Sequence, residues 1–329
     1  MRLPSFNYLE PITLTDALNL MEEYHGRAQP LAGGTELLPR MKLGLTHPTY
    51  LMSLKEIHEL KGIKSNKNEL YIGGMTSLRE IFLSTLLQQK FLAISEAAGS
   101  VAAPPLRNMG TIAGNLCQDT RCFFYNQSYF WRRGLKPCFK AGGNVCYAVP
   151  GSKKCFSVYQ GDLAPALIAF NAKVRIEKKG SSRIIPIEEL FSGKGEKPIV
   201  IADDELLTQV IVPIPEGIYG SSYRKFRLRN ALDYPLVSAA AFLAIDSEKK
   251  VKSVKVVLGA AGPAPVIVKE AEDILKGKKV EESAINEIAE AAYKRAQMVD
   301  NLGLPASYRK KMVRVFTKRA IENAFNSIK

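Results

Sequence analysis

The first 60 residues alternate between strand and helix patterns, which restricts the fold to a mixture of strands and helices. Thr13-Leu-Thr-Asp16 has the form of a capping box, in which the Thr13 hydroxyl and the Asp16 carboxylate bind free amides at a helix start. An apolar stripe follows at Leu14, Ala17, Leu18 and Met21. Gly26 ends this pattern, and residues 28–31 and 50–54 have strand composition. The order predicted is strand, helix, strand, helix, strand.

Two glycine-bearing loops follow helix or strand patterns. Ala32-Gly-Gly-Thr-Glu36 lies after the second strand, and Asn108-Met-Gly-Thr-Ile-Ala-Gly-Asn115 follows the break at Pro104-Pro105. Such loops let a backbone approach a ligand closely and expose amides to oxygen anions, although each is also compatible with a plain strand-to-helix corner. Neither contains the Rossmann G-x-G-x-x-G, and the chain has no Walker lysine loop. A nucleotide clamped by these loops would therefore bind through a different architecture.

The cysteines are confined to 39 residues, at Cys117, Cys122, Cys138, Cys146 and Cys155. Four thiolates can hold a tetrahedral metal or a cubane iron–sulfur cluster. Structural zinc and buried free cysteines that act as small hydrophobes remain alternatives, and the close C-x-x-C pairs of common zinc sites are absent. The N-terminus has no apolar signal core, so we expect a cytoplasmic protein without disulfides.

Composition indicates a globular chain of two or three domains. The 329 residues are 46% hydrophobic and 24% charged, and no apolar run approaches the roughly 18 residues of a membrane span. The net charge of +14 permits polyanion binding, but the basic residues are dispersed, which predicts a solvated face or a docking face for an acidic protein and no nucleic-acid site. The histidines, His25, His47 and His58, lack the spacing of a catalytic or metal pair.

Several motifs occur in the order seen in one family. They are Ala32-Gly-Gly-Thr-Glu36, Ile72-Gly-Gly-Met-Thr76, Thr111-Ile-Ala-Gly-Asn115, Asp162-Leu-Ala-Pro-Ala-Leu167, Asp204-Glu-Leu-Leu207 and Lys225-Phe-Arg-Leu-Arg229. Nearly end to end, the chain resembles the FAD-binding medium subunits of molybdenum hydroxylases, the xanthine dehydrogenase and carbon monoxide dehydrogenase group. This resemblance implies an α+β fold, with a PCMH-type FAD-binding domain of two α/β subdomains followed by a C-terminal domain of a three-stranded sheet and helices.

We expect the FAD-binding domain at residues 1–217, with subdomains at about 1–58 and 59–217, and the C-terminal domain at 218–329. The boundary is placed in the turn-rich stretch from Gly217 to Ser222. Periodicity predicts a strand from Val254 to Leu258 and helices from Ser283 to Met298 and from Ser307 to Phe325.

The resemblance implies which residues bind FAD. The first diphosphate loop comprises Gln29, Pro30, Leu31, Ala32, Gly33, Gly34, Thr35 and Glu36, and the second comprises Thr111, Ile112, Ala113, Gly114 and Asn115. The second loop has Ala113-Gly114 where the family commonly has Gly-Gly. Val101 is expected near the cofactor, Leu207 over the flavin ring and Asp162 at a turn or cofactor edge. Lys225 is expected near the isoalloxazine, where a cation favours reduced, anionic flavin.

Residues 118–158 form an insertion, because most of the family reaches the Asp-Leu-Ala-Pro segment sooner after the second loop. Ordered loops of this length are unusual in compact domains, and a bound cluster would order it. The insertion resembles that of the 4-hydroxybenzoyl-CoA reductases, whose medium subunit carries a [4Fe-4S] cluster as well as FAD. The implied ligands are Cys122, Cys138, Cys146 and Cys155. Cys117 is expected to be a buried structural thiol, and the aromatics from Phe123 to Trp131 to pack the loop.

The implied function is that of an electron-transfer subunit without a catalytic side chain, since the redox chemistry belongs to the cofactors. A ferredoxin-like donor would supply electrons through the [4Fe-4S] cluster and FAD to two [2Fe-2S] clusters in a small subunit and the molybdenum cofactor of a large one. The assembly would be a dimer of heterotrimers that removes a phenolic hydroxyl from an aromatic CoA thioester under anaerobic conditions. The alternatives are an oxidative molybdenum hydroxylase of purines, aldehydes or N-heterocycles, and a zinc-stabilised binding protein that is not an enzyme.

Overall fold

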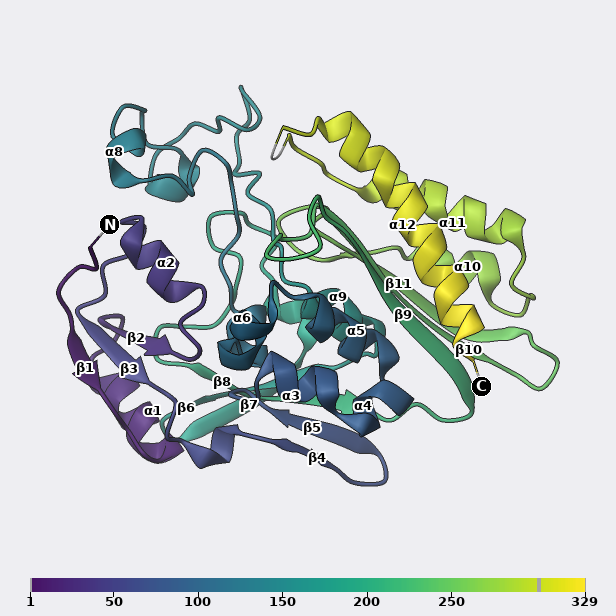
Figure 1. Ribbon diagram of the computed structural model, residues 1–329, viewed down its shortest axis with the longest axis horizontal. Coiled ribbons are helices and arrows are strands. Elements are labelled where there is room, and N and C mark those ends of the chain that lie inside the picture. Colours follow the sequence, from purple (N-terminus) through teal and green to yellow (C-terminus); the bar gives the residue numbers. More distant parts are fainter. Residues whose placement is uncertain (1, 301–302, 329) are drawn as a thin grey trace.

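A computed structural model of the chain describes residues 2–300 and 303–328 (Figure 1). The strands are β1 (Asn7–Leu9), β2 (Ala28–Leu31), β3 (Tyr50–Ser53), β4 (Ile63–Ser65), β5 (Glu69–Gly73), β6 (Lys173–Lys178), β7 (Ser181–Pro186), β8 (Leu206–Pro213), β9 (Ile218–Phe226), β10 (Val237–Ile245), β11 (Val251–Gly259) and β12 (Val266–Ile267). The α-helices are α1 (Leu14–Glu23), α2 (Leu37–Lys42), α3 (Leu78–Leu83), α4 (Thr85–Lys90), α5 (Leu92–Ser100), α6 (Pro104–Met109), α7 (Ile112–Leu116), α8 (Tyr129–Arg132), α9 (Leu163–Ala169), α10 (Glu270–Leu275), α11 (Glu282–Arg295) and α12 (Ala306–Asn326). Short 3-10 helices are η1 (His58–Leu60), η2 (Phe139–Ala141) and η3 (Ile187–Leu190).

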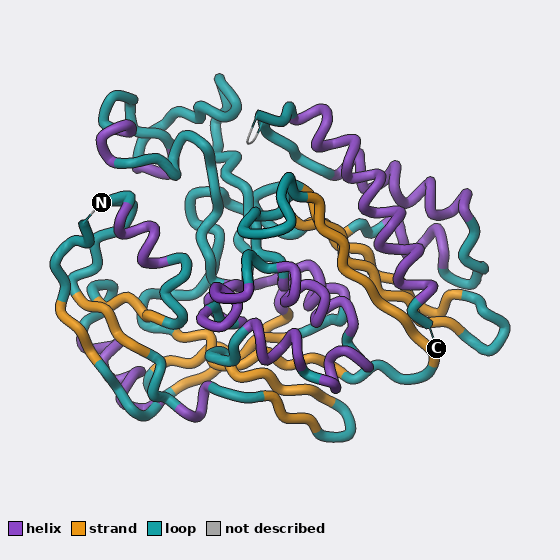
Figure 2. The backbone as a smooth tube through the Cα atoms, viewed as in Figure 1, coloured by secondary structure: helices purple, strands orange, loops and turns teal. Residues whose placement is uncertain are grey.

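The N-terminal part forms a parallel sheet in the order β1-β3-β2, as the alternation of strands and helices along the sequence suggests (Figure 2). α1 buries Ala17, Leu18 and Met21. At its start, the Thr13 hydroxyl accepts from the Asp16 amide at 3.1 Å. The predicted capping box is wrong in its second half, because the Asp16 carboxylate accepts from the Thr13 hydroxyl at 2.6 Å and not from a backbone amide.

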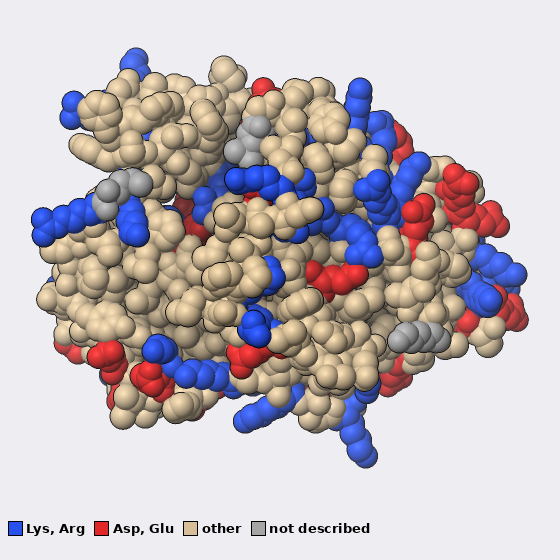
Figure 3. All heavy atoms as spheres, in the orientation of Figure 1, with Lys and Arg blue, Asp and Glu red and all other residues tan. Residues whose placement is uncertain are grey.

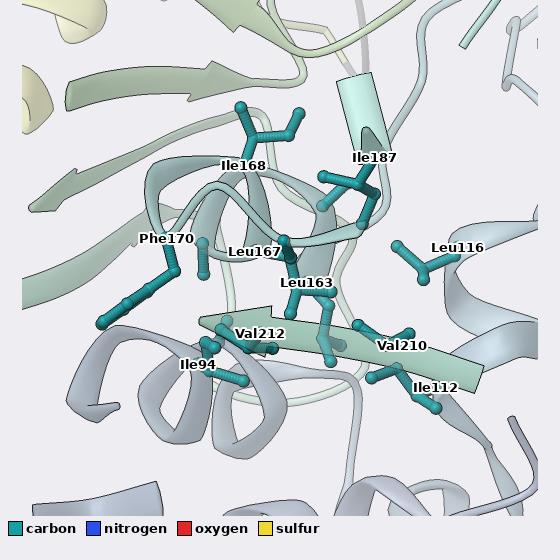
Figure 4. Packing of buried hydrophobic residues seen from close by; sticks show 14 of the residues in the cluster. Ile94, Ile112, Leu116, Leu163, Leu167, Ile168, Phe170, Ile187, Val210 and Val212 are labelled. Atoms are coloured by element: carbon teal, nitrogen blue, oxygen red, sulfur yellow. The ribbon is translucent and has the colours of Figure 1, made fainter. Parts of the chain in front are cut away.

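The middle part is an antiparallel sheet in the order β4-β5-β8-β6-β7. Its core surrounds α9, whose apolar sequence LAPALIA is buried at every position. Figure 4 shows Leu163 and Leu167 of α9 close to Val210 and Val212 of β8. This core includes Leu207 at the start of β8 and Ile112 of α7, so it holds the start of β8 against the helix that carries the second glycine loop.

The C-terminal sheet has the order β12-β11-β10-β9 and is antiparallel. β10 is buried on both faces: Ala239 and Ala241 face the core beneath α12, while Ala240 and Phe242 face the core around α9. The sheet therefore contributes to two cores. The prediction of three strands misses β12, a two-residue strand after Pro265 whose short length gives no periodic signal.

The α+β fold is confirmed, but the predicted turn at the domain boundary is wrong. β9 begins at Ile218 and continues to Phe226, so most of the stretch from Gly217 to Ser222 is strand. Pairing with β10 along the whole of β9 overrides the local turn composition. The predicted strand at 254–258 lies inside β11, and the two predicted helices correspond to α11 and α12.

The predicted insertion, residues 118–158, rises as a lobe that contains α8 and η2 and stands next to α2 (Figure 1). Of its aromatic residues, Phe124 packs against Tyr147 with ring centroids 5.7 Å apart. Phe123, Tyr129, Phe130 and Trp131 are exposed, so the expectation that this set packs the loop is wrong for them. Across residues 2–300 and 303–328, no helix combines the length and the apolar composition needed to cross a lipid bilayer.

Candidate functional site

A cavity of about 410 Å³ brings the two glycine loops together. Its volume lies in the range of small-molecule and cofactor sites. Of the predicted FAD-binding residues, all line this cavity except Leu31, Ile112 and Lys225. Ile112 instead belongs to the hydrophobic core, and Leu31 contributes its side chain to the packing around Gly34.

The first loop reaches the second through a backbone contact. A Cβ on Gly33 would lie 1.8 Å from the carbonyl oxygen of Met109, so only glycine fits there. Gly34 has a φ of 70°, in the left-handed region that favours glycine. Within the described chain, the amides of Gly33, Gly34 and Thr35 donate to no other residue. These amides are therefore available to bind oxygen anions.

The second loop has no comparable set of free amides. The amides of Ile112 and Ala113 donate to Thr76 and Gly74, both at 3.0 Å. The Gly114 amide donates to the Thr111 hydroxyl at 3.1 Å, and the Asn115 amide donates to the Thr111 carbonyl. This loop consequently shapes the cavity wall, and Ala113 is tolerated because its methyl group lies beside Gly74, which has no side chain.

Unpaired polar atoms indicate what the cavity can bind. Glu36 Oε1 and Arg40 Nε are buried and have no hydrogen-bond partner among the described residues. Buried polar atoms of this kind are costly unless a ligand or water satisfies them. Glu36 Oε1 can accept from a hydroxyl and Arg40 Nε can donate to an anion, so the cavity fits the ribose and phosphate groups of a dinucleotide such as FAD.

Lys225 does not line the cavity itself, but it forms an ion pair with Asp162, which does. Its ammonium lies 3.0 Å from the Asp162 carboxylate, and both side chains are almost fully buried. Tyr223 donates to the same carboxylate at 2.6 Å. Burial lowers the pKa of Lys225, and burial together with Asp162 raises the pKa of Tyr223. Because Asp162 balances the lysine charge, the predicted effect of Lys225 on a flavin would act through this pair.

Other residues that line the cavity belong to no motif that the sequence analysis could recognise. Ala102 and Leu232 have φ angles of 43° and 65°, rare for residues with a side chain, and the Leu232 amide donates to the Ala102 carbonyl at 3.2 Å. Such outliers cluster at functional sites. Tyr234 also lines the cavity, with the Arg121 guanidinium 3.8 Å from its ring centroid. These positions depend on contacts between segments far apart in the sequence.

The four cysteines predicted as metal ligands line one small cavity in the insertion, together with aromatic residues and Lys140. An amide, that of Ser157, donates to the Cys155 sulfur at 3.4 Å. Burial raises the pKa of Cys155 to about 11 and also raises the pKa of Cys122. In the absence of a metal these two thiols therefore stay protonated at neutral pH, and metal binding would release the protons.

The donors fit a metal centre in type and number, but the cavity between them is small. The cavity volume is about 10 Å³, close to the room that one water needs. In the part of the chain that the structure describes, no three side chains of the metal-ligating types are arranged to hold an ion. The cavity would have to widen to admit a cluster.

Cys117 is not the buried structural thiol that we expected. It follows the last residue of α7, and its side chain is exposed within the cavity lined by the two glycine loops. The residue is accessible from the cavity, but its thiol has protein atoms close by on most sides. The resulting desolvation raises the pKa of the Cys117 thiol to about 12. The thiol is therefore protonated and a poor nucleophile at neutral pH.

Comparison with known proteins places the chain in a family of flavoproteins. Residues 4–215 match the FAD binding domain in molybdopterin dehydrogenase, and residues 221–324 match the CO dehydrogenase flavoprotein C-terminal domain. The chain belongs to this family of FAD-binding subunits of molybdenum hydroxylases, and it is an oxidoreductase subunit.

Individual relatives match along nearly the whole chain. The carbon monoxide dehydrogenase medium chain of Afipia carboxidovorans is 29% identical over 97% of this chain and 96% of its own length. The glyceraldehyde dehydrogenase medium chain of Sulfolobus acidocaldarius is 26% identical over 97% and 98%. The solved carbon monoxide dehydrogenase of Hydrogenophaga pseudoflava matches with a TM-score of 0.82 and 25% identity over 100% of both chains.

Proposed function

We propose that this chain is the FAD- and [4Fe-4S]-binding electron-transfer subunit of a molybdenum enzyme of the 4-hydroxybenzoyl-CoA reductase type. Such an enzyme removes a phenolic hydroxyl from an aromatic CoA thioester reductively. The observation that carries the proposal is the convergence of four insertion cysteines on one cavity, where Cys122, Cys138, Cys146 and Cys155 supply the donor set of a cubane cluster. The insertion that holds them supplies part of the wall of the FAD cavity, through Gln118 and Asp119.

The chain's own residues bind and orient the cofactors, which supply the one- and two-electron chemistry when bound. The free amides of Gly33, Gly34 and Thr35 would hold the diphosphate. Leu207, only 7% exposed on the cavity wall, would cover the flavin and exclude water. The Asp162–Lys225 pair would place a balanced charge beside the ring. Leu31 and Ile112 would lie next to the cofactor through their backbone atoms, because their side chains point away from the cavity.

The partners that we propose are a large molybdenum-cofactor subunit and a small subunit with two [2Fe-2S] clusters, in a cytoplasmic dimer of heterotrimers. The designation of relatives as medium chains supports an assembly with other subunits. The FAD-binding domain would comprise residues 1–217 and the C-terminal domain 218–329. A ferredoxin-like donor is favoured by residues 120–161, which contain seven Lys and Arg residues and no Asp or Glu.

An oxidative molybdenum hydroxylase is the second candidate. The relatives reported above are carbon monoxide and glyceraldehyde dehydrogenases, whose names describe oxidation. In that enzyme the same flavin cavity would operate with electrons leaving through this chain. A structural zinc ion in the cysteine cavity is compatible with either direction, so the metal and the direction need separate measurements.

Metal and cofactor analysis of anaerobically purified protein tests the proposal. We expect about four iron, about four acid-labile sulfide and one FAD per chain. Cys138→Ser should lose the iron and keep the FAD, whereas Cys117→Ser, whose thiol lies outside the cysteine cavity, should keep both. Zinc in place of iron, or FAD without metal, would refute the cluster and leave the direction of electron flow to a separate measurement. Reoxidation of the reduced complex by 4-hydroxybenzoyl-CoA then tests the reductive direction.

A further inference from the structure

Helix α2 follows the first glycine loop directly and is weakly stabilised by its own sequence. It has six residues, contains Pro39, lacks a side-chain cap and buries only Met41. Helices this short do not persist without tertiary contacts. The position of α2, and with it the position of the loop that presents free amides to the cavity, must therefore be set by neighbouring segments.

The insertion contacts the start and the middle of α2 through ion pairs. At the start, Arg121 lies 2.6 Å from Glu36, the residue that precedes the helix. In the middle, Arg40 lies 2.9 Å from Asp119, and Asp119 lies 2.5 Å from Lys140. The Lys140 side chain is 3% exposed and lines the cysteine cavity, so this network joins that cavity to α2.

The insertion also contacts the end of α2. Arg132, the last residue of α8, donates through Nη2 to the Gly44 carbonyl at 2.7 Å and to the Leu43 carbonyl at 3.4 Å. Gly44 has a φ of 65°, and a Cβ placed there would lie 3.3 Å from that of Tyr129. Figure 1 shows α8 of the insertion next to α2. The insertion thus contacts α2 at both ends through the cations Arg121 and Arg132, and in the middle through the carboxylate of Asp119.

We propose that the insertion acts as a clamp on α2, and that Arg132 and Lys140 are positioning residues that fix the first glycine loop for FAD. Charge-assisted hydrogen bonds are roughly twice as strong as neutral ones, and these connect two segments that are distant in sequence. Preorganising a binding loop increases affinity because less ordering occurs on binding. The state of the cysteine cavity is thereby linked to FAD affinity.

FAD titration of the full-length apoprotein, followed by flavin fluorescence, tests the clamp. We expect Arg132→Gln to weaken FAD binding about tenfold, because it removes the contact at the end of α2 without touching the cavity wall. Arg132→Lys should bind more tightly than Arg132→Gln, because it keeps a cationic donor. Arg133→Gln is the matched control: Arg133 is exposed and contacts the Phe130 ring, not α2.

Two results would overturn the inference. One is unchanged FAD affinity in both Arg132→Gln and Lys140→Gln. The other is equal weakening in Arg133→Gln, which would indicate a general effect of charge. Melting temperatures of the apoproteins separate positioning from misfolding, since a loss of positioning lowers FAD affinity in a protein that still melts normally. The inference requires FAD binding alone, so it can hold even if iron analysis refutes the cluster.

Discussion

At the scale of single residues, the FAD cavity is shaped more by backbone than by side chains. The first loop offers the unpaired amides of Gly33, Gly34 and Thr35, and the residues around Met109 pack directly against it. A diphosphate is bound well by such amides because they are fixed before the ligand arrives. The side chains that matter most, Glu36 and Arg40, add unpaired polar atoms at the edge of this loop.

Gly33→Ala should therefore separate the two loops. The added methyl group would lie 1.8 Å from the Met109 carbonyl, far inside van der Waals contact. We expect FAD affinity to fall at least about tenfold, measured by equilibrium fluorescence titration. Gly134→Ala is the control, because its added Cβ would meet its nearest neighbour at an ordinary 3.5 Å. If Gly33→Ala keeps normal FAD affinity, the close approach of the loops is not needed.

The ion pair of Glu205, at the cavity wall, should make the free energy of unfolding depend on pH. The Arg183 guanidinium binds this carboxylate at 2.9 and 2.8 Å and, with the Ala202 amide, lowers the pKa of Glu205 below its ordinary value. A lowered folded-state pKa contributes stability above the unfolded-state pKa, and that stability is lost as the pH falls through the folded-state value.

Glu205→Gln should therefore lower the free energy of unfolding by about 0.5–1 kcal/mol at pH 7, since Arg183 is partly exposed. The difference from the wild type should shrink as the pH falls below the unfolded-state pKa of about 4.3. Urea unfolding at pH 7 and pH 3.5 measures it. Glu216→Gln, an exposed carboxylate without an ion pair among the described residues, should show no such difference. A penalty that does not change with pH would contradict the role of the Glu205 charge.

Much of this site could be predicted because its signals are local. Gly33-Gly34 and the strand before it are adjacent in the sequence, and the structure has both where the pattern places them. The Asp162–Lys225 pair could not be predicted as a contact, because 63 positions separate the partners and only the packing of α9 on β10 and β11 brings them together. The exposure of Cys117 likewise depends on the cavity formed by distant segments.

At the scale of elements, the sequence pattern predicts helices that have one apolar face. It predicts strands less well where hydrogen bonding to a neighbouring strand determines the structure. The apolar pattern predicts α12 almost to its ends, whereas Gly217, just before β9, and Gly220, near its start, favour a turn where the structure has strand. Gly220 is needed there for another reason: a Cβ would lie 2.1 Å from the Ala324 carbonyl of α12. Close helix–strand packing, which the sequence does not display, selects this glycine.

Arg309 attaches α12 to the residues that flank the C-terminal sheet. Its guanidinium is fully buried, donates to the Leu236 carbonyl at 2.8 Å and to the Ala260 carbonyl at 3.3 Å, and also binds the Val299 carbonyl. Burial lowers its pKa to about 10, so it remains charged at neutral pH.

Arg309→Met should lower the free energy of unfolding by about 2–4 kcal/mol, because it leaves several buried carbonyls without a donor. Chemical denaturation followed by circular dichroism measures the loss. Lys311→Met, on the exposed side of the same helix, should change stability by less than about 0.5 kcal/mol. Equal effects of the two substitutions would show that helix propensity, and not the buried guanidinium, accounts for the loss.

At the scale of the whole molecule, charge is unevenly distributed along the chain. Although the net charge is +14, Asp and Glu are absent from two basic stretches: residues 120–161 contain seven Lys and Arg residues, and residues 301–321 contain six. Arg121 and Lys140 of the first stretch are paired with Glu36 and Asp119. The exposed cations that remain, such as Lys153 and Lys154, lie on a lobe that carries blue side chains at its outer edge in Figure 3.

This distribution predicts that an acidic redox donor is steered toward the lobe. Long-range attraction raises the association rate and is screened by salt, because the Debye length is only about 8 Å at physiological ionic strength. Lys153→Gln combined with Lys154→Gln should slow reduction of the complex by a plant-type ferredoxin about two- to fivefold at low salt, and the difference should vanish near 0.5 M salt. The matched control replaces Lys64 and Lys67, two exposed lysines around the β4–β5 hairpin, and removes the same charge from another part of the surface. Stopped-flow reduction across ionic strengths separates the outcomes: equal slowing by both pairs would mean that the donor senses net charge alone, whereas slowing confined to the lobe places the docking surface beside the cysteine cavity.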